Sequence, residues 1–359
     1  MCSCILPPSL HSHASLSLPI RHLPRLGSRC SHQESHSTRD YELHSLDFST
    51  AFMQGSLHEE IWLRRPPVFT GSFPPGTQWS LRRPVYGLRQ APREWHDTLR
   101  TTLVALGFAP STAYPSLFLR TDTSLPPFYV LVYVDDLVFA RADTAGLAHV
   151  KSKLQKRHTC TDLGELRSYL GLQITRDRAQ RTITLTQSHM VQQVLQRFGF
   201  TTSGMGLVLR GRRPVVLTGH ADASWADDQA TQRSSQGYIF ILGSGSVSWR
   251  STRSSSVLNS SCEAEIYAGA MAAQELRWLT YILTDLGEQP RSPPVLYVDN
   301  KAMLALCREH RLEHRTKHIA LRYFLARELQ QRGQLRLAYV ASEANTADIF
   351  TQALAPGDH

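Results

Sequence analysis

Two adjacent aspartates, Asp135 and Asp136, interrupt the apolar run YVLVYVDDLVFA from Tyr129 to Ala140. The flanking residues are mostly β-branched or aromatic, so the run predicts a tight β-hairpin with both carboxylates at its tip. Adjacent like charges on a stiff hairpin are unfavourable unless a cation joins them. Mg²⁺ prefers carboxylate oxygens and leaves room for phosphates, so the run indicates a metal site for phosphoryl transfer. The alternative is a solvated turn, where Asp is common.

A third aspartate, Asp47, ends a predicted short strand in the string HSLDFSTAFMQG. Between this string and the hairpin lies RPVYGLRQAPREW, a basic turn that runs into an amphipathic helix. In their order and in their residues, the three sequence motifs resemble the palm of reverse transcriptases from Ty1/copia-type long-terminal-repeat retrotransposons. The resemblance implies that Asp47 and Asp135 hold two Mg²⁺ ions, with Asp136 beside them, and that Mn²⁺ could replace Mg²⁺.

The same resemblance assigns the contacts to the incoming nucleotide. Phe52 matches the ring under the incoming sugar, where its bulk would exclude a 2′-hydroxyl and so select deoxynucleoside triphosphates. Gln90 matches a glutamine that contacts this nucleotide, and Arg89 could help to position phosphate. The alternative for Phe52 is an ordinary core ring.

The second half of the chain carries another set of acids in a different order of elements. Its pattern predicts three strands, a helix, a strand, a helix, a strand and a helix, which resembles the ribonuclease H fold at the carboxyl end of copia-type polyproteins. The resemblance implies that Asp222, Glu263, Asp299 and Asp348 hold two Mg²⁺ ions and cleave the RNA strand of an RNA/DNA hybrid. Taken singly, Glu263 would also suit the first turn of a helix by its charge alone.

The chain departs from the family pattern in both halves. Ser224 stands where the pattern usually has a second Asp, although no metal ligand is lost with it. Little foldable sequence precedes Tyr41, and TTSGMGLVLRGRRP joins the two halves without thumb and connecting segments. We expect impaired polymerisation, because phosphate contacts supply most nonspecific affinity for nucleic acid.

The predicted fold class is α/β throughout. A palm-type sheet with helices on one face is followed by a mixed five-stranded sheet with flanking helices. The predicted division of the chain is a disordered segment 1–40, a palm at 41–200, a short junction at 201–214 and a ribonuclease H-like domain at 215–356.

Composition agrees with a partner that is a polyanion. The chain has 359 residues, a net charge of +9 and a pI near 9.4, which suits nucleic acid. The expected partners are an RNA template, a DNA primer, an RNA/DNA hybrid and deoxynucleoside triphosphates; the oligomeric state is open. No apolar run is long enough to span a membrane. Scattered cysteines indicate a reduced, intracellular protein of the cytoplasm or nucleus.

Three functions follow as hypotheses. The first is a copia-type reverse transcriptase with ribonuclease H activity and an impaired polymerase. The second is a nuclease on RNA/DNA hybrids alone. The third is a noncatalytic nucleic-acid-binding module or an inactive remnant.

Overall fold

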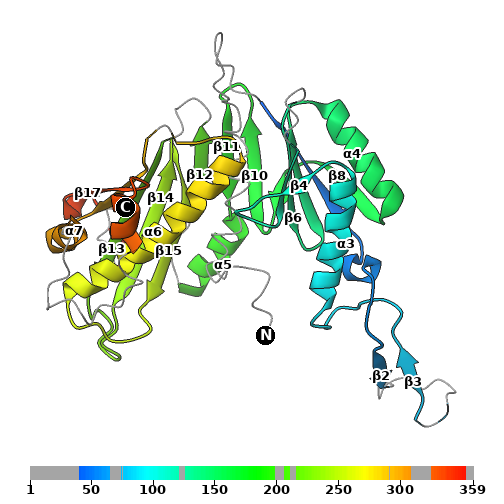
Figure 1. Ribbon diagram of the computed structural model, residues 1–359, viewed down its shortest axis with the longest axis horizontal. Helices are drawn as coiled ribbons and strands as arrows, with labels where there is room; N and C mark the ends of the chain where they lie inside the picture. Colours follow the sequence, from blue (N-terminus) through cyan, green and yellow to red (C-terminus); the bar gives the residue numbers. More distant parts are fainter. Residues whose placement is uncertain are drawn as a thin grey trace. The chain divides into compact units, whose positions relative to one another are not determined.

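The computed structural model describes residues 40–64, 74, 76–120, 126–198, 206–210, 216–290, 292–308 and 325–352. The predicted disordered segment 1–40 lies outside these residues, apart from Asp40. The described chain forms two compact units, which divide between Leu166 and Arg167. Figure 1 shows the elements of both units.

The first unit is built on a six-stranded antiparallel sheet with the strand order β4-β5-β6-β7-β1-β8. The strands are β1 (Glu42–Phe48), β4 (Ala109–Pro110), β5 (Leu117–Arg120), β6 (Phe128–Tyr133), β7 (Asp136–Arg141) and β8 (Cys160–Glu165). A 3-10 helix, η3 (Ala51–Gln54), follows β1, and a small ribbon joins β2 (Trp62–Arg64) to β3 (Gln78–Ser80).

Two helices, α3 (Ala91–Ala105) and α4 (Thr144–Arg157), pack on one face of this sheet. Their buried side chains share a core with Leu46, Phe48 and Leu137. Successive strand residues point to opposite faces. Asp47 lies between Leu46 and Phe48, and Asp136 directly precedes Leu137, so both aspartates face the other side of the sheet.

The second unit starts with a four-stranded antiparallel sheet of order β12-β11-β10-β9. Its strands are β9 (Ser168–Tyr169), β10 (Leu172–Asp177), β11 (Thr182–Thr186) and β12 (Leu207–Arg210), and α5 (Ser188–Phe198) lies between β11 and β12 in the chain. The edge strand β12 contacts the neighbouring sheet, where the Arg210 backbone N–H donates to Ser244 Oγ at 2.9 Å.

A mixed five-stranded sheet of order β15-β14-β13-β16-β17 completes the second unit. The first three strands pair antiparallel, whereas β16 and β17 join in parallel. The strands are β13 (Leu217–Ser224), β14 (Ser235–Leu242), β15 (Gly245–Arg253), β16 (Val295–Val298) and β17 (Arg336–Tyr339).

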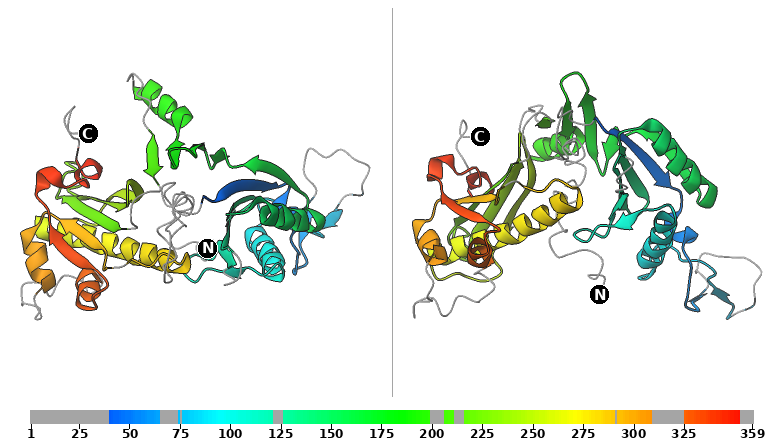
Figure 2. Two further views of the ribbon diagram at one scale, coloured as in Figure 1. Left: turned by 90° about the horizontal axis from the view of Figure 1, so that it is seen from above. Right: turned by 45° about the horizontal axis from the view of Figure 1, so that its top comes forward.

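The long helix α6 (Ser261–Asp285) lies along one face of the five-stranded sheet, as both views in Figure 2 show. Its buried residues Ala272, Leu276 and Leu279 contact the core side chains of the sheet. Two shorter helices, α7 (Lys301–Arg308) and α8 (Leu325–Gln331), and the 3-10 turns η6 (Ser342–Ala344) and η7 (Asp348–Phe350) complete the described elements.

The α/β prediction is confirmed, including the helices on one face of the first sheet and the mixed five-stranded second sheet. The division of the compact units differs from the predicted palm end at residue 200. The reason is that β9 to β12 form a sheet of their own, whose edge strand contacts β15. None of the described helices combines the length and apolar character that crossing a membrane requires.

Candidate metal centre and aspartate hairpin

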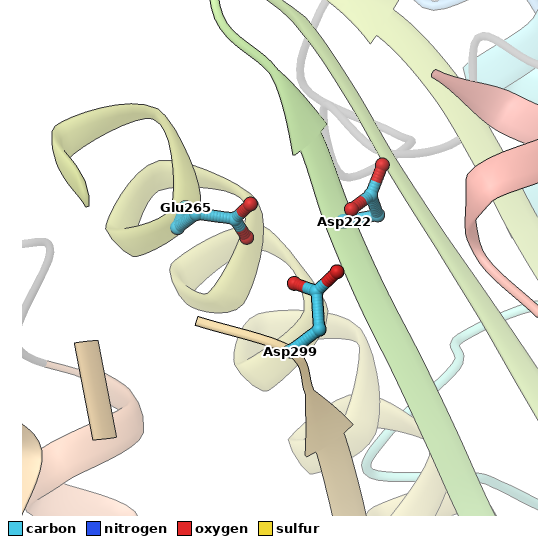
Figure 3. Close-up of side chains that lie close together, drawn as sticks. All are labelled: Asp222, Glu265 and Asp299. Carbon is cyan, nitrogen blue, oxygen red and sulfur yellow. The ribbon is translucent and has the colours of Figure 1, made fainter. Parts of the chain in front are cut away.

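Three carboxylates from distant parts of the sequence meet at one end of the five-stranded sheet (Figure 3). Asp222, Glu265 and Asp299 each offer a ligand atom, and these atoms lie within 4.8 Å of one another. Within the described ranges, this is the only group of three or more His, Cys, Asp or Glu residues arranged so closely.

Sheet register explains why two of the three meet. In the parallel pair β13·β16, His220 lies opposite Tyr297. Asp222 and Asp299 each follow two residues later, so they reach the same end and the same face of the sheet. The first turns of α6 then bring Glu265 over this end, where its carboxylate accepts a hydrogen bond from the Ala223 backbone.

Without a cation, three carboxylates this close together, two of them buried, are electrostatically unfavourable in their charged form. Desolvation, followed by the charges of Asp222 and Asp299, raises the pKa of Glu265 to about 9. Burial also raises the pKa of Asp222, although the Thr351 hydroxyl donates to its carboxylate and opposes the shift. Glu265 Oε2 is buried and has no hydrogen-bond partner within the described chain.

The donor set therefore fits a hard divalent cation. Like carboxylates at this spacing favour protonation unless a positive ion joins them, and Mg²⁺ takes oxygen ligands of this kind. No ion pair with Lys or Arg neutralises the three acids within the part of the chain that the structure describes.

Asp348 lies beside the group but is not one of the three. Burial and the nearby Asp222 and Asp299 raise its pKa to about 6. Its loop is fixed to the sheet, because the Asn345 side-chain amide donates to the Ala221 carbonyl at 3.1 Å. In the same loop, Ser342 Oγ donates to Asp299 Oδ2 at 2.8 Å.

The structure corrects the choice of glutamate on α6. Glu263 does not join the group; its carboxylate accepts from the Asn259 backbone N–H at 2.8 Å and from Asn259 Nδ2 at 3.0 Å. It therefore stabilises the start of the helix. Glu265, which sequence reasoning missed, lies two residues later and so about 200° around the helix.

A signal for Glu265 was available in the helical period. It lies on the same face as Ala268, Ala272, Leu276, Leu279 and Leu283, all of which are buried. An acid that heads an apolar stripe must be buried, and a buried acid needs a partner or an ion.

The aspartates of the first unit lie around a hairpin, but within the described residues they do not form a close group of three ligands like that of the second unit. Asp47 lies directly opposite Asp136 in the antiparallel pair β1·β7, so their side chains share a face. Asp135 occupies the two-residue turn between β6 and β7, and its carbonyl accepts from the Phe48 backbone N–H at 2.8 Å. Burial, then the charges of Asp135 and Asp47, raises the pKa of Asp136.

The turn itself has an uncommon backbone. Val134 has φ 54°, a region that β-branched residues rarely adopt. The indole Nε1 of the buried Trp95 donates to the Val134 carbonyl at 2.5 Å, which holds the turn against helix α3. The hairpin aspartates therefore sit on a tightly fixed support.

The three predicted nucleotide-binding residues belong to the same unit as this hairpin. Phe52 belongs to the core and its ring lies 4.5 Å from the largely exposed ring of Tyr86, centroid to centroid. Gln90 is half-buried at the N-cap of α3, and Arg89 is exposed. Their roles toward a nucleotide stay predictions.

Residues 35–207 match the family described as reverse transcriptase (RNA-dependent DNA polymerase). Over 88% of its length, the chain is 30% identical to the Pol polyprotein from transposon RE2 of Arabidopsis thaliana. Over 87%, it is 25% identical to the Pol polyprotein from transposon TNT 1-94 of Nicotiana tabacum. The chain spans 27% and 30% of these two relatives.

Two solved structures are remotely similar. A foamy viral protease-reverse transcriptase in complex with an RNA/DNA hybrid aligns with 94% of this chain and 47% of its own, at 14% identity and a TM-score of 0.47. An N-terminal ribonuclease H domain from Mycobacterium tuberculosis aligns with 38% of this chain and 91% of its own, at 14% identity and a TM-score of 0.29.

Proposed function

Because this chain belongs to the Ty1/copia-type retrotransposon Pol polyproteins, we propose that it is an RNA-directed DNA polymerase with ribonuclease H activity. Of the two activities, the geometry best supports hydrolysis of the RNA strand of an RNA/DNA hybrid. The observation that carries this proposal is the group of three carboxylates, Asp222, Glu265 and Asp299, within 4.8 Å of one another.

In this proposal the protein supplies a rigid set of oxygen ligands. Asp222, Glu265 and Asp299 would hold Mg²⁺, with Asp348 next to them for a second ion. The bound ions would activate the attacking water and stabilise the departing oxygen of the phosphodiester. The hydrogen bonds from Thr351 to Asp222 and from Ser342 to Asp299 fix the carboxylates before substrate binds.

Cleavage of a labelled RNA/DNA hybrid in the presence of Mg²⁺ tests the nuclease. Asp299→Asn and Glu265→Gln should each reduce the rate by at least about 100-fold, because even residues behind metal ligands are worth 10- to 100-fold. The matched control is Glu263→Gln, which keeps an oxygen to accept the bonds from Asn259 and should stay within a few-fold of the parent. Equal loss in both glutamine variants would contradict the assignment of Glu265.

A second activity, DNA synthesis on an RNA template, is favoured by the pairing of Asp47 with Asp136 and by the fixed turn that carries Asp135. We expect this activity to be weaker, because the short junction after Phe198 leaves fewer phosphate contacts for primer and template. Primer extension with deoxynucleoside triphosphates should fall to background in Asp135→Asn. Extension that survives this change would argue against the hairpin as the polymerase site.

The two assays also separate the remaining hypothesis. A chain that binds the hybrid but neither cleaves it nor extends a primer would be a noncatalytic nucleic-acid-binding module.

A further inference from the structure

A groove of about 690 Å³ on the first unit is lined by polar and basic residues only, apart from one cysteine. No Asp or Glu is among the lining residues, which are Gln54, Arg83, Gln155, Lys156, Arg157, His158, Thr159 and Cys160. The groove is distinct from the aspartate hairpin and from the carboxylate group of the second unit.

The floor of this groove is fixed by side-chain hydrogen bonds. The Gln54 side-chain amide forms two hydrogen bonds with the backbone of Thr159. Its Nε2 donates to the Thr159 carbonyl at 2.8 Å, and its Oε1 accepts from the Thr159 N–H at 2.9 Å. The same Nε2 donates to the Ser49 carbonyl at 2.8 Å. The loop after β1 and the loop after α4 are therefore held together as one surface.

Three cations converge on the groove from two separate elements. Arg83 is held at the rim by its bond to the Met53 carbonyl at 3.1 Å, while Lys156 and Arg157 end helix α4. All three are exposed, and none forms an ion pair within the described residues. The dipole of α4 stabilises cations at its C-terminal end, which is a reason for Lys156 and Arg157 to lie there. Arg83 does not belong to a helix end, so the dipole does not account for it.

Three basic residues elsewhere in the same unit pair with acids. Arg93 pairs with Asp97, Arg141 with Asp143 and Lys151 with Asp162. The charge of the groove is thus available to an external anion, in contrast to these paired sites.

The lining favours phosphate over nucleobases. No Phe, Tyr or Trp lines the groove, and its single aromatic ring is that of His158, so the lining offers little surface for base stacking. The His158 ring packs edge-on against Phe48 and Trp95. Burial, followed by the Arg157 charge, lowers the pKa of His158, which favours its neutral form. A volume of this size holds a drug-sized ligand, hence a short stretch of one strand.

We propose that this groove binds the phosphodiester backbone of single-stranded nucleic acid without regard to sequence. The site deepens the proposed function, because it would anchor a strand beside the aspartate hairpin. Thr161, the residue after the groove-lining Cys160, lies opposite Asp47 in the sheet. The same ring cluster of Phe48, Trp95 and His158 also supports the hairpin turn through the bond from Trp95 to Val134.

Binding of the full chain to a fluorescent oligothymidylate, measured by anisotropy in EDTA over a series of salt concentrations, tests this proposal. The variant Lys156→Gln/Arg157→Gln should lower the slope of log affinity against log salt by about 1.4, since each lost contact to a single strand is worth about 0.7. Arg83→Gln, on the opposite rim, should lower it by about a further 0.7.

The matched control is Lys153→Gln/Arg100→Gln, which removes the same charge from exposed residues of α4 and α3 outside the groove. Equal effects of the two double variants, no effect of the groove variant, or no binding by the parent chain would overturn the proposal. The proposal would also be overturned if the groove variant lowered the salt slope for duplex DNA but not for the single strand. Binding is measured in EDTA without turnover, so failure of the proposed catalysis would be seen separately, in the cleavage and extension assays.

Discussion

Glu265 is an acid at the head of an apolar helical stripe, and its protonation should be visible in the stability of the protein. Burial and then the charges of Asp222 and Asp299 raise its pKa from 4.5 to about 9. An acid with a raised pKa binds its proton more tightly in the folded state. Its stabilising contribution is therefore complete below pH 4.5 and is lost as the pH rises toward 9.

We therefore predict that the metal-free protein loses stability between about pH 5 and pH 9, by up to about 1.4 kcal/mol per pH unit from this residue. Thermal unfolding in EDTA across this range measures the effect, and Glu265→Gln should flatten it. Mg²⁺ should raise the unfolding temperature at high pH more than at low pH. Parallel pH profiles for the parent and Glu265→Gln would contradict the prediction.

At the scale of single residues, sequence patterns found the strand-borne acids and missed the helical one. Asp222 lies near the end of β13 and Asp299 directly follows β16, and strand ends of a parallel pair meet at one edge. Glu263 and Glu265 both lie in the first turns of a helix, so proximity to the strand ends could not separate them. The phase of the helix decides between them, and it follows from the apolar residues further along α6.

At the scale of elements, hydrogen bonds of Ser260 and Glu263 stabilise the start of α6. Ser260 is the N-cap, and its Oγ accepts from the Glu263 N–H at 3.1 Å. Ser260→Ala should cost about 1 kcal/mol of folding free energy, because one of the first backbone donors loses its partner. Urea denaturation measures this cost.

The neighbouring Ser261→Ala is the matched control, since Ser261 is exposed and lies inside the helix rather than at the cap. Its unfolding free energy should stay within about 0.5 kcal/mol of the parent. Similar losses in the two variants would show that the cap bond contributes little.

The sequence predicted element types better than their partners or extents. The hairpin around Asp135 has the expected strands, but the left-handed backbone of Val134 is not typical of valine, so tertiary packing by Trp95 overrides local preference there. The last element, predicted as a helix, is within the described residues a three-residue 3-10 turn that begins at Asp348, and the bond of Asn345 to the sheet fixes the preceding loop.

At the scale of the whole molecule, the two units have separate cores and separate candidate sites. The core around Leu276 and Leu296 belongs to the second unit, and the core around Leu46 and Leu137 to the first. Strand patterns do not encode which sheet a strand will join, because that choice depends on contacts distant in the sequence. Residues 167–200 illustrate this, because the predicted palm and the family match both include them, whereas the compact unit that contains them is the second.

This division makes a prediction about where the chain can be cut. The bonds that fix the carboxylate group come from within the second unit, for example from Thr351 to Asp222 and from Ser342 to Asp299. A chain of residues 167–359 should therefore fold and cleave an RNA/DNA hybrid with Mg²⁺. A chain that begins at residue 215 contains the same four acids but lacks β9 to β12.

The shorter chain should be the less stable of the two. Its β15 loses the contact with β12, where Val208 and Leu209 pack against Gly245 so closely that an added Cβ on the glycine would lie 2.5 Å from Leu209. Burial of apolar surface stabilises by about 25 cal/mol per Å², so the exposed edge should lower the unfolding temperature of the 215–359 chain. Calorimetry on both chains, with Asp299→Asn as the inactive control for cleavage, measures this. Equal unfolding temperatures would show that β9 to β12 do not stabilise the five-stranded sheet, and would favour a domain boundary near residue 215.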